Sequence, residues 1–574
     1  MFLKKDPRPN GRLYLSIVKS YRDPKTKANK QKAILSVGFM DELEKLYPDP
    51  IAHFTEVARQ MTEEEKQAQT FEFTIQNDEV MDIGTNDLKN IGFAALSKIY
   101  HELGIHSFLI NRERNLRAKH PLNNIMKLLV YDRILHPASK LASYKNKDMY
   151  VENFDFSIDS LYRSLKIFAK HKQALIRDIH ENVKMSYGRN TSNVYYDVTN
   201  YYFHTEEENA LIAKGFSKDK KNKAIVQMGL LMDKNGLPMT YELFRGNTND
   251  FETLLPVLSD VKKNFNLERV IVVADKGLNS GSNKAYNIIK GDGYIFSRSL
   301  RGSKATEEVR QYALNQDDYK QIGDGYKIKS RVYPTDIWVE NQNGKKVKVL
   351  IDEKHIVFYS EKYAQRAMHK RNETIAKAMK LISSPALYSK AENYGALKYI
   401  KGMKLNKETG ELYPEKKGII PFIDEELIQA EEALDGYYSI VTSELDMPDN
   451  EVIEAYRGLW EIEESFKITK TQLEARPVYL TLEEHIEAHF LTCFISLLLL
   501  KILSMKTGGQ FSEGILIESL RKANVDLLEM NKYKGVYYDE VLKCIDDAIG
   551  THLGRKYWNL QDLKKSISDT KQKV

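Results

Sequence analysis

The stretch Asn193–Phe203 constrains the fold of this chain more than any other. It reads NVYYDVTNYYF, and its β-branched and aromatic residues predict a buried β-strand rather than a helix. Asp197 stands in the middle of this strand, where a carboxylate carries a desolvation cost unless a charged or hydrogen-bonding group meets it. Two interpretations are open from this stretch alone. Asp197 caps a turn or lies on an edge strand, or it is a metal ligand in a buried sheet.

A second carboxylate follows a second apolar run. Arg269–Ser280 reads RVIVVADKGLNS, which predicts a buried parallel strand that ends at Asp275. The ends of such strands are where open α/β sheets place ligand-binding residues. Between the two carboxylates the sequence predicts strands at Ala224–Met232 and Met239–Phe244, joined by a DKNG turn, and then a helix over 250–265. A further strand, Gly293–Ser297, is expected to end at Arg298.

A third carboxylate is expected on a helix over Glu451–Leu473, with Asp449 as its N-cap. Residues spaced by seven along this helix share one face with Lys467, and they are Tyr456, Glu463 and Lys470. A solvated face of Glu and Lys side chains would give the same pattern without any function. Glu464 is the alternative to Glu463 as a ligand.

The N-terminal third contains two further predicted regions. Residues 1–50 have the pattern of a β-hairpin with a Lys-rich loop over Arg22–Lys32, which is either solvated or in contact with phosphate. A helix over 51–66 and a strand over 70–82 are expected next. From Asn86 to about Lys184 the pattern is helical, with helix starts near Pro121 and Ser157. This helical region is interpreted either as a DNA-binding unit or as a support domain. Its basic residues are Arg112, Arg114, Arg117, Lys119, His120 and Lys127.

Residues 300–435 interrupt the α/β pattern and are interpreted as a β-rich insertion, because a strand over Gly436–Ser443 resumes the sheet. Four short strands are predicted in it, over Lys327–Tyr333, Ile337–Glu340, Val347–Ile351 and His355–Tyr359. A basic helix over Glu361–Ile382 comes next, and its candidate DNA contacts are Lys362, Arg366, Lys370, Arg371 and Lys377. The last 70 or so residues are expected to be helical, with a frayed tail, LKKSISDTKQKV.

Composition excludes several classes of protein. The net charge of +6 permits a nucleic-acid partner without requiring one, and two cysteines rule out a disulfide framework or a Cys-based zinc site. The N-terminus lacks the apolar core of a signal peptide. The most apolar run, Phe490–Leu503, is short for a membrane span and contains Lys501, so a buried core helix is expected. The protein is therefore expected to be cytoplasmic, with no membrane partner.

Taken together, the three stretches resemble the DDE transposases of bacterial insertion sequences. More narrowly, they are similar to the superfamily whose third motif is Tyr-x2-Arg-x3-Glu-x6-Lys. Tyr456, Glu463 and Lys470 fall on that motif in register, whereas its Arg position holds Leu459 and Arg457 lies two residues earlier. The segment Ala475–Leu499 also resembles the region after this motif in long members of the group, so the resemblance covers about residues 193–500.

The resemblance implies an α/β fold with an RNase H-like, retroviral-integrase-type catalytic domain. The expected division of the chain is an N-terminal β-rich region (1–85), a helical region that is a candidate for DNA binding (86–188), the catalytic domain (189–299 and 436–500), an insertion (300–435) and a C-terminal helical region (501–574).

The resemblance also implies a metal-dependent reaction on DNA. Asp197 would bridge two Mg²⁺ or Mn²⁺ ions, and Asp275 and Glu463 would each complete one of them. Two such ions about 4 Å apart can activate a water and stabilise a leaving 3′-oxygen, and Mg²⁺ prefers carboxylate oxygens. Glu463 is preferred to Glu464 because it shares a helix face with the other motif residues. The residues expected to contact DNA are Tyr456, Lys470, Arg457, Lys467, Arg298 and Lys276.

The function implied is cleavage at the ends of a mobile element and transfer of the freed 3′-hydroxyl to target DNA. The expected partners are the terminal inverted repeats, the target DNA and a second copy of the chain in a synaptic complex, with Phe511–Leu563 as the better candidate for the dimer contact. Two alternatives remain: a metal-dependent nuclease that cuts without joining, and a domesticated DNA-binding protein without catalysis.

Overall fold

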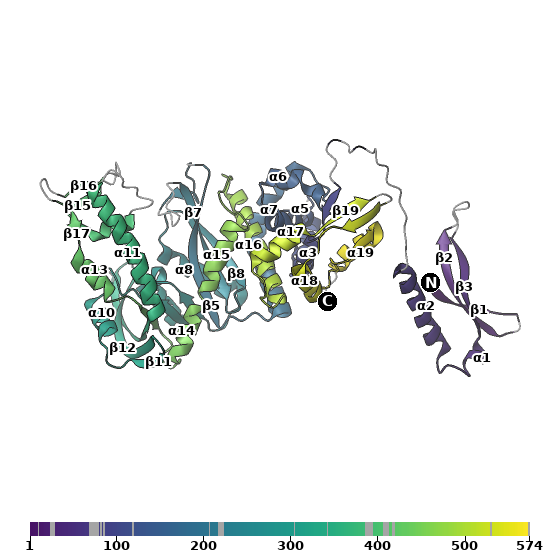
Figure 1. Cartoon of the computed structure of the whole chain (residues 1–574), viewed down its shortest axis with the longest axis horizontal. Helices are drawn as coiled ribbons and strands as arrows, with labels where there is room; N and C mark the ends of the chain where they lie inside the picture. Colours follow the sequence, from purple (N-terminus) through teal and green to yellow (C-terminus); the bar gives the residue numbers. More distant parts are fainter. Residues whose placement is uncertain are drawn as a thin grey trace. The chain divides into compact units, whose positions relative to one another are not determined.

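The computed structural model describes residues 1–9, 11–22, 29–67, 80, 83, 87–116, 120–205, 207–215, 223–302, 305–340, 343–384, 394–405, 412–415, 420–528 and 531–571. The chain divides into two compact units, Met1–Thr85 and Asn86–Val574, and each is described by itself (Figure 1).

The first unit is a small antiparallel sheet followed by two helices. Its strands β1 (Phe2–Pro7), β2 (Leu13–Arg22) and β3 (Asn29–Phe39) pair in that order. Two helices follow, α1 (Met40–Leu43) and α2 (Pro50–Gln67). The predicted hairpin and helix are confirmed. Residues 23–28 of the predicted Lys-rich loop lie outside the described residues, as does most of the strand predicted over 70–82.

The second unit is organised around a 10-stranded mixed sheet. The strand order is β11-β12-β13-β18-β10-β9-β5-β7-β6, and β8 pairs with β7. The strands β5, β9 and β10 are parallel to one another, whereas β7 is antiparallel to both β5 and β8. The strand bounds are β5 (Asn193–Tyr202), β6 (Ala213–Lys214), β7 (Ala224–Asp233), β8 (Pro238–Arg245), β9 (Ile271–Ala274), β10 (Gly293–Ser297), β11 (Lys320–Gly323), β12 (Tyr326–Glu340), β13 (Lys346–Ser360) and β18 (Tyr437–Thr442). The strands predicted at β5, β7, β8, β9, β10 and β18 are confirmed.

Helices cover both faces of this sheet. One face carries α8 (Asp250–Phe265), α9 (Gly281–Ile289) and α10 (Glu307–Leu314), and the other carries α14 (Asp449–Arg457) and α15 (Trp460–Thr471). The single helix predicted over Glu451–Leu473 is therefore wrong, and its N-cap is Pro448 instead of Asp449. The helix breaks at Gly458, where a Cβ atom would lie 2.1 Å from the Tyr195 hydroxyl. This contact with β5 could not be foreseen from local sequence.

The four short strands predicted in the insertion are confirmed as β-structure, but the breaks between them are wrong, because they merge into two strands of 15 residues each, β12 and β13. These strands pair in one continuous register, and β13 joins β18 in the main sheet. At Pro334 the described residues give β12 one neighbouring strand only, β13, and such an edge position is where a sheet tolerates proline. Glu353 does not interrupt β13 because Lys284 and Tyr294 both donate to Oε1 of its buried carboxylate, and Arg298 lies 4.0 Å from the other oxygen. The predicted basic helix is confirmed as α11 (Glu361–Ser383), and α13 (Glu425–Glu432) comes after it.

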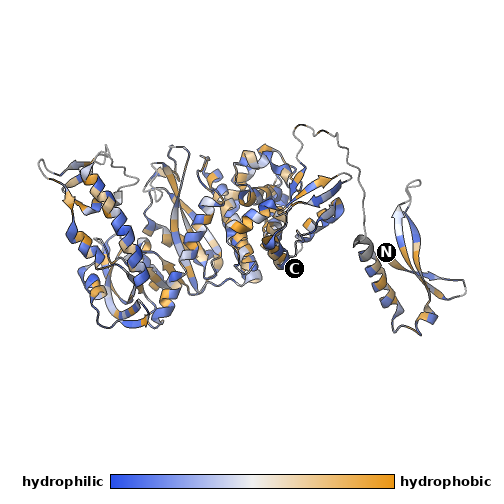
Figure 2. Ribbon diagram, viewed as in Figure 1, coloured by the Kyte–Doolittle hydropathy of each residue, from blue (hydrophilic) through white to orange (hydrophobic). Residues whose placement is uncertain are grey.

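A helical body packs beside the sheet, centred on α16 (Glu483–Lys506). Among the described residues, α16 is the one helix long and apolar enough to cross a membrane, but 89% of its apolar window is buried inside the protein (Figure 2). The interpretation as a core helix is confirmed. The other helices of the body are α3 (Phe93–Glu102), α4 (Ile105–Asn115), α5 (Leu122–Leu135), α6 (Lys140–Lys145), α7 (Ile158–Tyr187), α17 (Glu513–Lys522), α18 (Glu540–Ile549) and α19 (Leu560–Asp569).

The C-terminal region is not wholly helical, which corrects the prediction for it. The strands β19 (Asn524–Leu528), β20 (Lys532–Gly535) and β21 (Tyr557–Asn559) form a sheet with β4 (Leu88–Asn90). The predicted frayed tail is also wrong as far as Asp569, because Leu563 and Ile567 of α19 are buried. The expected domain boundary at residue 500 falls inside α16. The remaining domain boundaries stay predictions.

Candidate active site

The strand register places the first two predicted carboxylates side by side. Tyr196 of β5 is the partner of Ala274 of β9 in a parallel pair, so the next position on each strand holds Asp197 and Asp275. Residues at matching positions of adjacent strands point to the same face of a sheet. Apolar residues surround both positions, since Val198 and Ala274 are fully buried. Two carboxylates from separate segments are thus held next to each other by the pairing of two buried strands.

The helix α15 lies along the same face of β5. The hydroxyl of Tyr201 shares a hydrogen bond of 2.6 Å with Thr469, and Lys470 Nζ donates to Thr199 Oγ1 at 2.7 Å. At the other end, Gly458 lies against Tyr195. These contacts alternate along β5 and bracket Asp197, which shares their face.

This packing brings Glu463 towards Asp197. Glu463 and Lys470 are seven residues apart on α15, so they lie on one helix face. Seven helical residues advance about 10.5 Å, the length of about three strand residues. Since Lys470 contacts Thr199, Glu463 is level with the part of β5 that contains Asp197.

Asp275 is oriented by two hydroxyl groups on the same carboxylate oxygen. Ser297 Oγ donates to Asp275 Oδ1 at 2.7 Å, and Tyr456 donates to the same atom at 3.3 Å. Burial raises the pKa of Tyr456 above its ordinary value, and the nearby Tyr438 and Asp275 add to this. The Tyr456 hydroxyl therefore stays protonated and able to donate at neutral pH.

Glu463 lies within the electrostatic reach of Asp275. Partial burial raises the pKa of Glu463, and the negative charge of Asp275 raises it further, although the side chain still reaches solvent. Close carboxylates that repel one another favour a cation between them, and carboxylate oxygens are the ligands that Mg²⁺ prefers. Within the part of the chain that the structure describes, no three His, Cys, Asp or Glu side chains are already gathered around one metal position. The chemistry of the donors fits a divalent cation, and the carboxylates come from three separate elements.

Three other predicted residues have partners of their own. Glu464, the alternative ligand, is half-buried and pairs with Lys467 at 3.1 Å. Lys467 is 68% exposed, and its contacts give it no place beside Asp275. Arg457 pairs with Glu454 and lies near the Tyr326 hydroxyl, at 3.5 Å. The geometry thus separates Glu463 from Glu464 by their partners.

Arg298 and Lys276 lie close to Asp275 in the chain but differ in environment. Arg298 donates to the Tyr333 hydroxyl at 2.5 Å and lies 4.0 Å from Glu353, which belongs to the face covered by α9. Its guanidinium is therefore directed to the face opposite Ser297. Lys276 is exposed in the turn directly after Asp275.

The candidate DNA contacts on α11 divide into two groups. Arg371 is buried and pairs with Asp435 and Glu432, so the prediction that it contacts DNA is wrong. Local sequence could not show this, because the partners are Glu432, at the end of α13, and Asp435, just after that helix. The other four side chains are exposed on a largely hydrophilic helix (Figure 2), and they are Lys362, Arg366, Lys370 and Lys377.

Sequence reasoning missed Thr199, Ser297 and Tyr438. Thr199 could have been found, because it lies two residues after Asp197 and so shares its face. Ser297 ends a strand that pairs with β9, but only the strand order brings it to Asp275. Tyr438 contacts the Tyr456 ring at a centroid distance of 6.0 Å, and its pKa is raised by burial and by the charges of Asp275 and Glu463.

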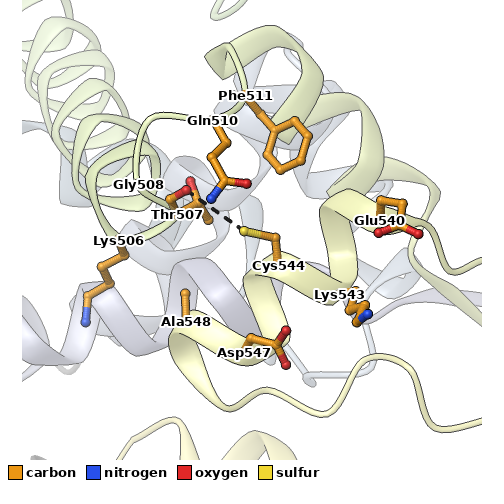
Figure 3. A pocket seen from close by; sticks show the side chains of 10 residues that line it. All are labelled: Lys506, Thr507, Gly508, Gln510, Phe511, Glu540, Lys543, Cys544, Asp547 and Ala548. Carbon is orange, nitrogen blue, oxygen red and sulfur yellow. Dashed lines mark hydrogen bonds between the residues drawn. The ribbon is translucent and has the colours of Figure 1, made fainter.

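A cavity of about 570 Å³ lies elsewhere, between the end of α16 and α18 (Figure 3). Its lining mixes Lys506 and Lys543 with Glu540 and Asp547, and the thiol of Cys544 points towards the carbonyl of Thr507. It contains none of the predicted site residues.

Comparison with known proteins gives two family matches. A model of the transposase DDE domain matches residues 196–499, and a model described as the IS1634 family transposase N-terminal domain matches residues 3–72. No curated protein matches the chain. Among solved structures, a piggyBac transposase synaptic complex with hairpin DNA, determined by cryo-EM, is 6% identical with a TM-score of 0.35. The match covers 84% of this chain and 85% of that one.

Proposed function

Because this chain belongs to the DDE-domain transposases of insertion sequences, we propose that it cleaves the ends of its element and joins the freed 3′-hydroxyls to target DNA. A transposase of this family is a phosphoryl-transfer enzyme. The joining step is the part of this proposal that goes beyond the family assignment.

We propose that the catalytic domain is RNase H-like. The strand order β8-β7-β5-β9-β10 supports this, because three antiparallel strands are followed by two parallel ones. Asp197 lies on β5, the first of these five strands in chain order, and Asp275 directly follows β9, the fourth. The β12–β13 hairpin then extends the same sheet beyond β18.

The ligand set that we propose is Asp197, Asp275 and Glu463, with two Mg²⁺ or Mn²⁺ ions. When bound, divalent ions of this kind activate a water and stabilise the leaving 3′-oxygen. The chain's own residues hold the substrate. Lys470, restrained by Thr199, binds a phosphate oxygen beside Asp197 as a point charge. Ser297 and Tyr456 orient Asp275, so that its second oxygen is directed away from both donors.

The proposed partners are duplex DNA, as terminal repeats and as target, and a second copy of the chain. Two ends must be joined in one event, and each site holds one set of carboxylates, which supports a homodimer in a synaptic complex. The sequence favours Phe511–Leu563 for the dimer contact. In the structure, however, one side of α17 in this segment is buried and β19 pairs with β4, so these two elements pack within the chain. We place the enzyme in the cytoplasm, on the nucleoid when it binds DNA.

The observation that carries the proposal is the placement of Asp197 and Asp275 at adjacent positions of β5 and β9, on the face that α15 covers. The test is a reaction of the purified protein with Mg²⁺, a labelled duplex of the element's terminal repeat and a target plasmid. We expect 3′-hydroxyl ends at the repeat, then covalent joining to the plasmid, and neither with EDTA. Cleavage without joining would identify a nuclease, and specific binding without cleavage a non-catalytic descendant.

A further inference from the structure

The N-terminal unit has a strongly divided charge. Residues 1–39, which contain the three strands, have ten Lys and Arg against two Asp, a net charge of +8. Residues 40–67, which contain α1 and α2, have three Lys and Arg against eight Asp and Glu, a net charge of −5. The sheet segment therefore carries more positive charge than the whole chain, whose net charge is +6. An anion would approach this unit from its sheet and not from its helices.

The far half of the β2–β3 pair is exposed on both of its faces. The buried part of β2 ends at Val18. Leu43 and Ala58 of the two helices are also buried. On β3, residues 29–36 are all exposed, and residues 29–32 of these lie beyond the position opposite Val18. We call the paired segments 19–22 and 29–32 the basic ribbon. Of its side chains that the structure describes, Lys19 is half-buried and the others are exposed, so they contribute little to the core.

The cross-strand pairs of the basic ribbon are unusual for a protein surface. Lys19 lies opposite Lys32, and Tyr21 lies opposite Lys30 on the same face. Like charges directly opposite each other destabilise an antiparallel pair. Tyr21 is also 44% exposed. Such a surface suits a polyanionic partner, because the lysines can contact its charges and the tyrosine ring can contact its flat apolar groups.

The helical region over 86–188 is a weaker candidate for the same role. Its basic residue Lys127 is buried against Glu152, and Arg133 is buried against the carbonyl of Leu473. Thirteen residues of α5 are buried, because α5 packs in the core with α16. The helix α5 therefore supports the fold and has little free surface to insert into a DNA groove.

We propose that the basic ribbon lies in the major groove of duplex DNA and binds the end of the element. This rests on the proposed function for the identity of the DNA, but not for the contact itself. The major groove is about 12 Å wide and admits a two-stranded ribbon, whose strands lie about 4.8 Å apart. Lys19, Lys30 and Lys32 then contact phosphates on the groove walls, and Gln31 and Ser20, on the alternate face, are available to base edges.

The first test compares two triple variants of the full chain by fluorescence anisotropy over a range of salt. Lys19→Gln, Lys30→Gln and Lys32→Gln remove three charges from the ribbon, and Lys543→Gln, Lys564→Gln and Lys565→Gln remove three exposed charges from the other unit. The probe is the duplex of the terminal repeat, with a scrambled duplex and a matched RNA duplex beside it. For the ribbon variant we expect at least about a tenfold loss of affinity and a salt slope lower by about two to three. The control variant should behave as wild type.

A second measurement locates the contact. An iron chelate is attached to Gln31→Cys in a Cys544→Ser background, where Cys493 is buried, and Lys565→Cys serves as the control position. We expect cuts in the repeat duplex from position 31 alone. Wild-type affinity and slope in the ribbon variant, or no cuts from position 31, would overturn the inference even if the ends are cleaved normally. Tighter binding to the RNA duplex would also overturn it. Ribbon-dependent DNA binding without any cleavage would instead count against the proposed function.

Discussion

Lys470 donates a hydrogen bond of 2.7 Å to Thr199, which lies two residues beyond Asp197 on the same face of β5. This contact holds a flexible side chain near the carboxylate that it is proposed to serve. A second contact restrains it, because its amine lies 5.6 Å from the centre of the Tyr201 ring. Both of these contacts of the Lys470 amine are thus with residues of β5. The amine is held near Asp197 because Thr199 and Asp197 are alternate residues on one face of that strand.

We expect Lys470→Met to reduce cleavage of the terminal repeat strongly, by about 100-fold, because it removes a charge-assisted contact with the phosphate. Thr199→Val should cost much less, about fivefold, since it removes one neutral hydrogen bond and leaves the charge. Single-turnover cleavage measures both. Lys470→Arg is the control, because it keeps the charge with a different geometry. An equal loss in Thr199→Val and Lys470→Met would mean that the pair supports only the fold.

The three carboxylates give the second prediction. Asp197→Asn, Asp275→Asn and Glu463→Gln should each lower cleavage by at least about 100-fold, because each removes an ionised ligand. Binding to the repeat should remain, since none of the three holds a phosphate. Glu464→Gln is the matched control, because that residue pairs with Lys467. Near wild-type cleavage by Glu463→Gln, with loss in Glu464→Gln, would exchange the two assignments.

The shared acceptor on Asp275 gives the third prediction. Ser297→Ala and Tyr456→Phe each remove one of the two donors to Oδ1. We expect each to raise the Mg²⁺ concentration for half-maximal cleavage by about 10- to 100-fold, as is found for groups that orient a metal ligand. The double variant should show less than the product of the single losses, since both donors act on one atom. A fully multiplicative effect would indicate that they act separately.

Much of the candidate site could be predicted because each of its parts has a local signal. Asp197 and Asp275 stand out as carboxylates within or directly after apolar strands, and the spacing of Tyr456, Glu463 and Lys470 is that of a helix face. What joins these parts is the pairing of β5 with β9, and no local pattern encodes that pairing.

The parts that could not be predicted depend on contacts between distant segments. At the helix break, Gly458 lies against the hydroxyl of the distant Tyr195, and Arg371 is buried where it pairs with Asp435. The strand β13 continues through Glu353 because Lys284, 69 residues away, neutralises it. In each case a tertiary partner outweighs the local preference of the residue.

The helix α11 gives the fourth prediction, in which one of its basic residues differs from the rest. Arg366→Gln, Lys370→Gln and Lys377→Gln together should lower the salt slope of DNA binding by about 0.9 for each phosphate that is no longer neutralised. Arg371→Gln should leave the slope unchanged and lower the free energy of unfolding by about 2 kcal/mol, because Asp435 would lose one of its two arginine partners and keep Arg301. Chemical denaturation measures the second effect. A change of slope in Arg371→Gln at unchanged stability would place that side chain on the DNA after all.

The last prediction concerns stability, pH and Mg²⁺. Burial and the charge of Asp275 raise the pKa of Glu463 above its value in the unfolded chain. The folded state therefore binds the proton more readily, so the contribution of this group is fully present below the unfolded pKa and is lost as pH rises through the folded pKa. At neutral pH the ionised Glu463 disfavours folding.

Glu463→Gln should consequently melt slightly higher than wild type in EDTA at about pH 8, by on the order of 1 °C, and this gain should vanish near about pH 4. Mg²⁺ should reverse the order at pH 8, because an ion that binds only the folded state stabilises the protein that keeps the full ligand set. Melting curves with and without Mg²⁺ at both pH values measure this, and Glu464→Gln is the control. If Mg²⁺ stabilises Glu463→Gln as much as wild type, Glu463 does not hold the ion, whatever its effect on cleavage.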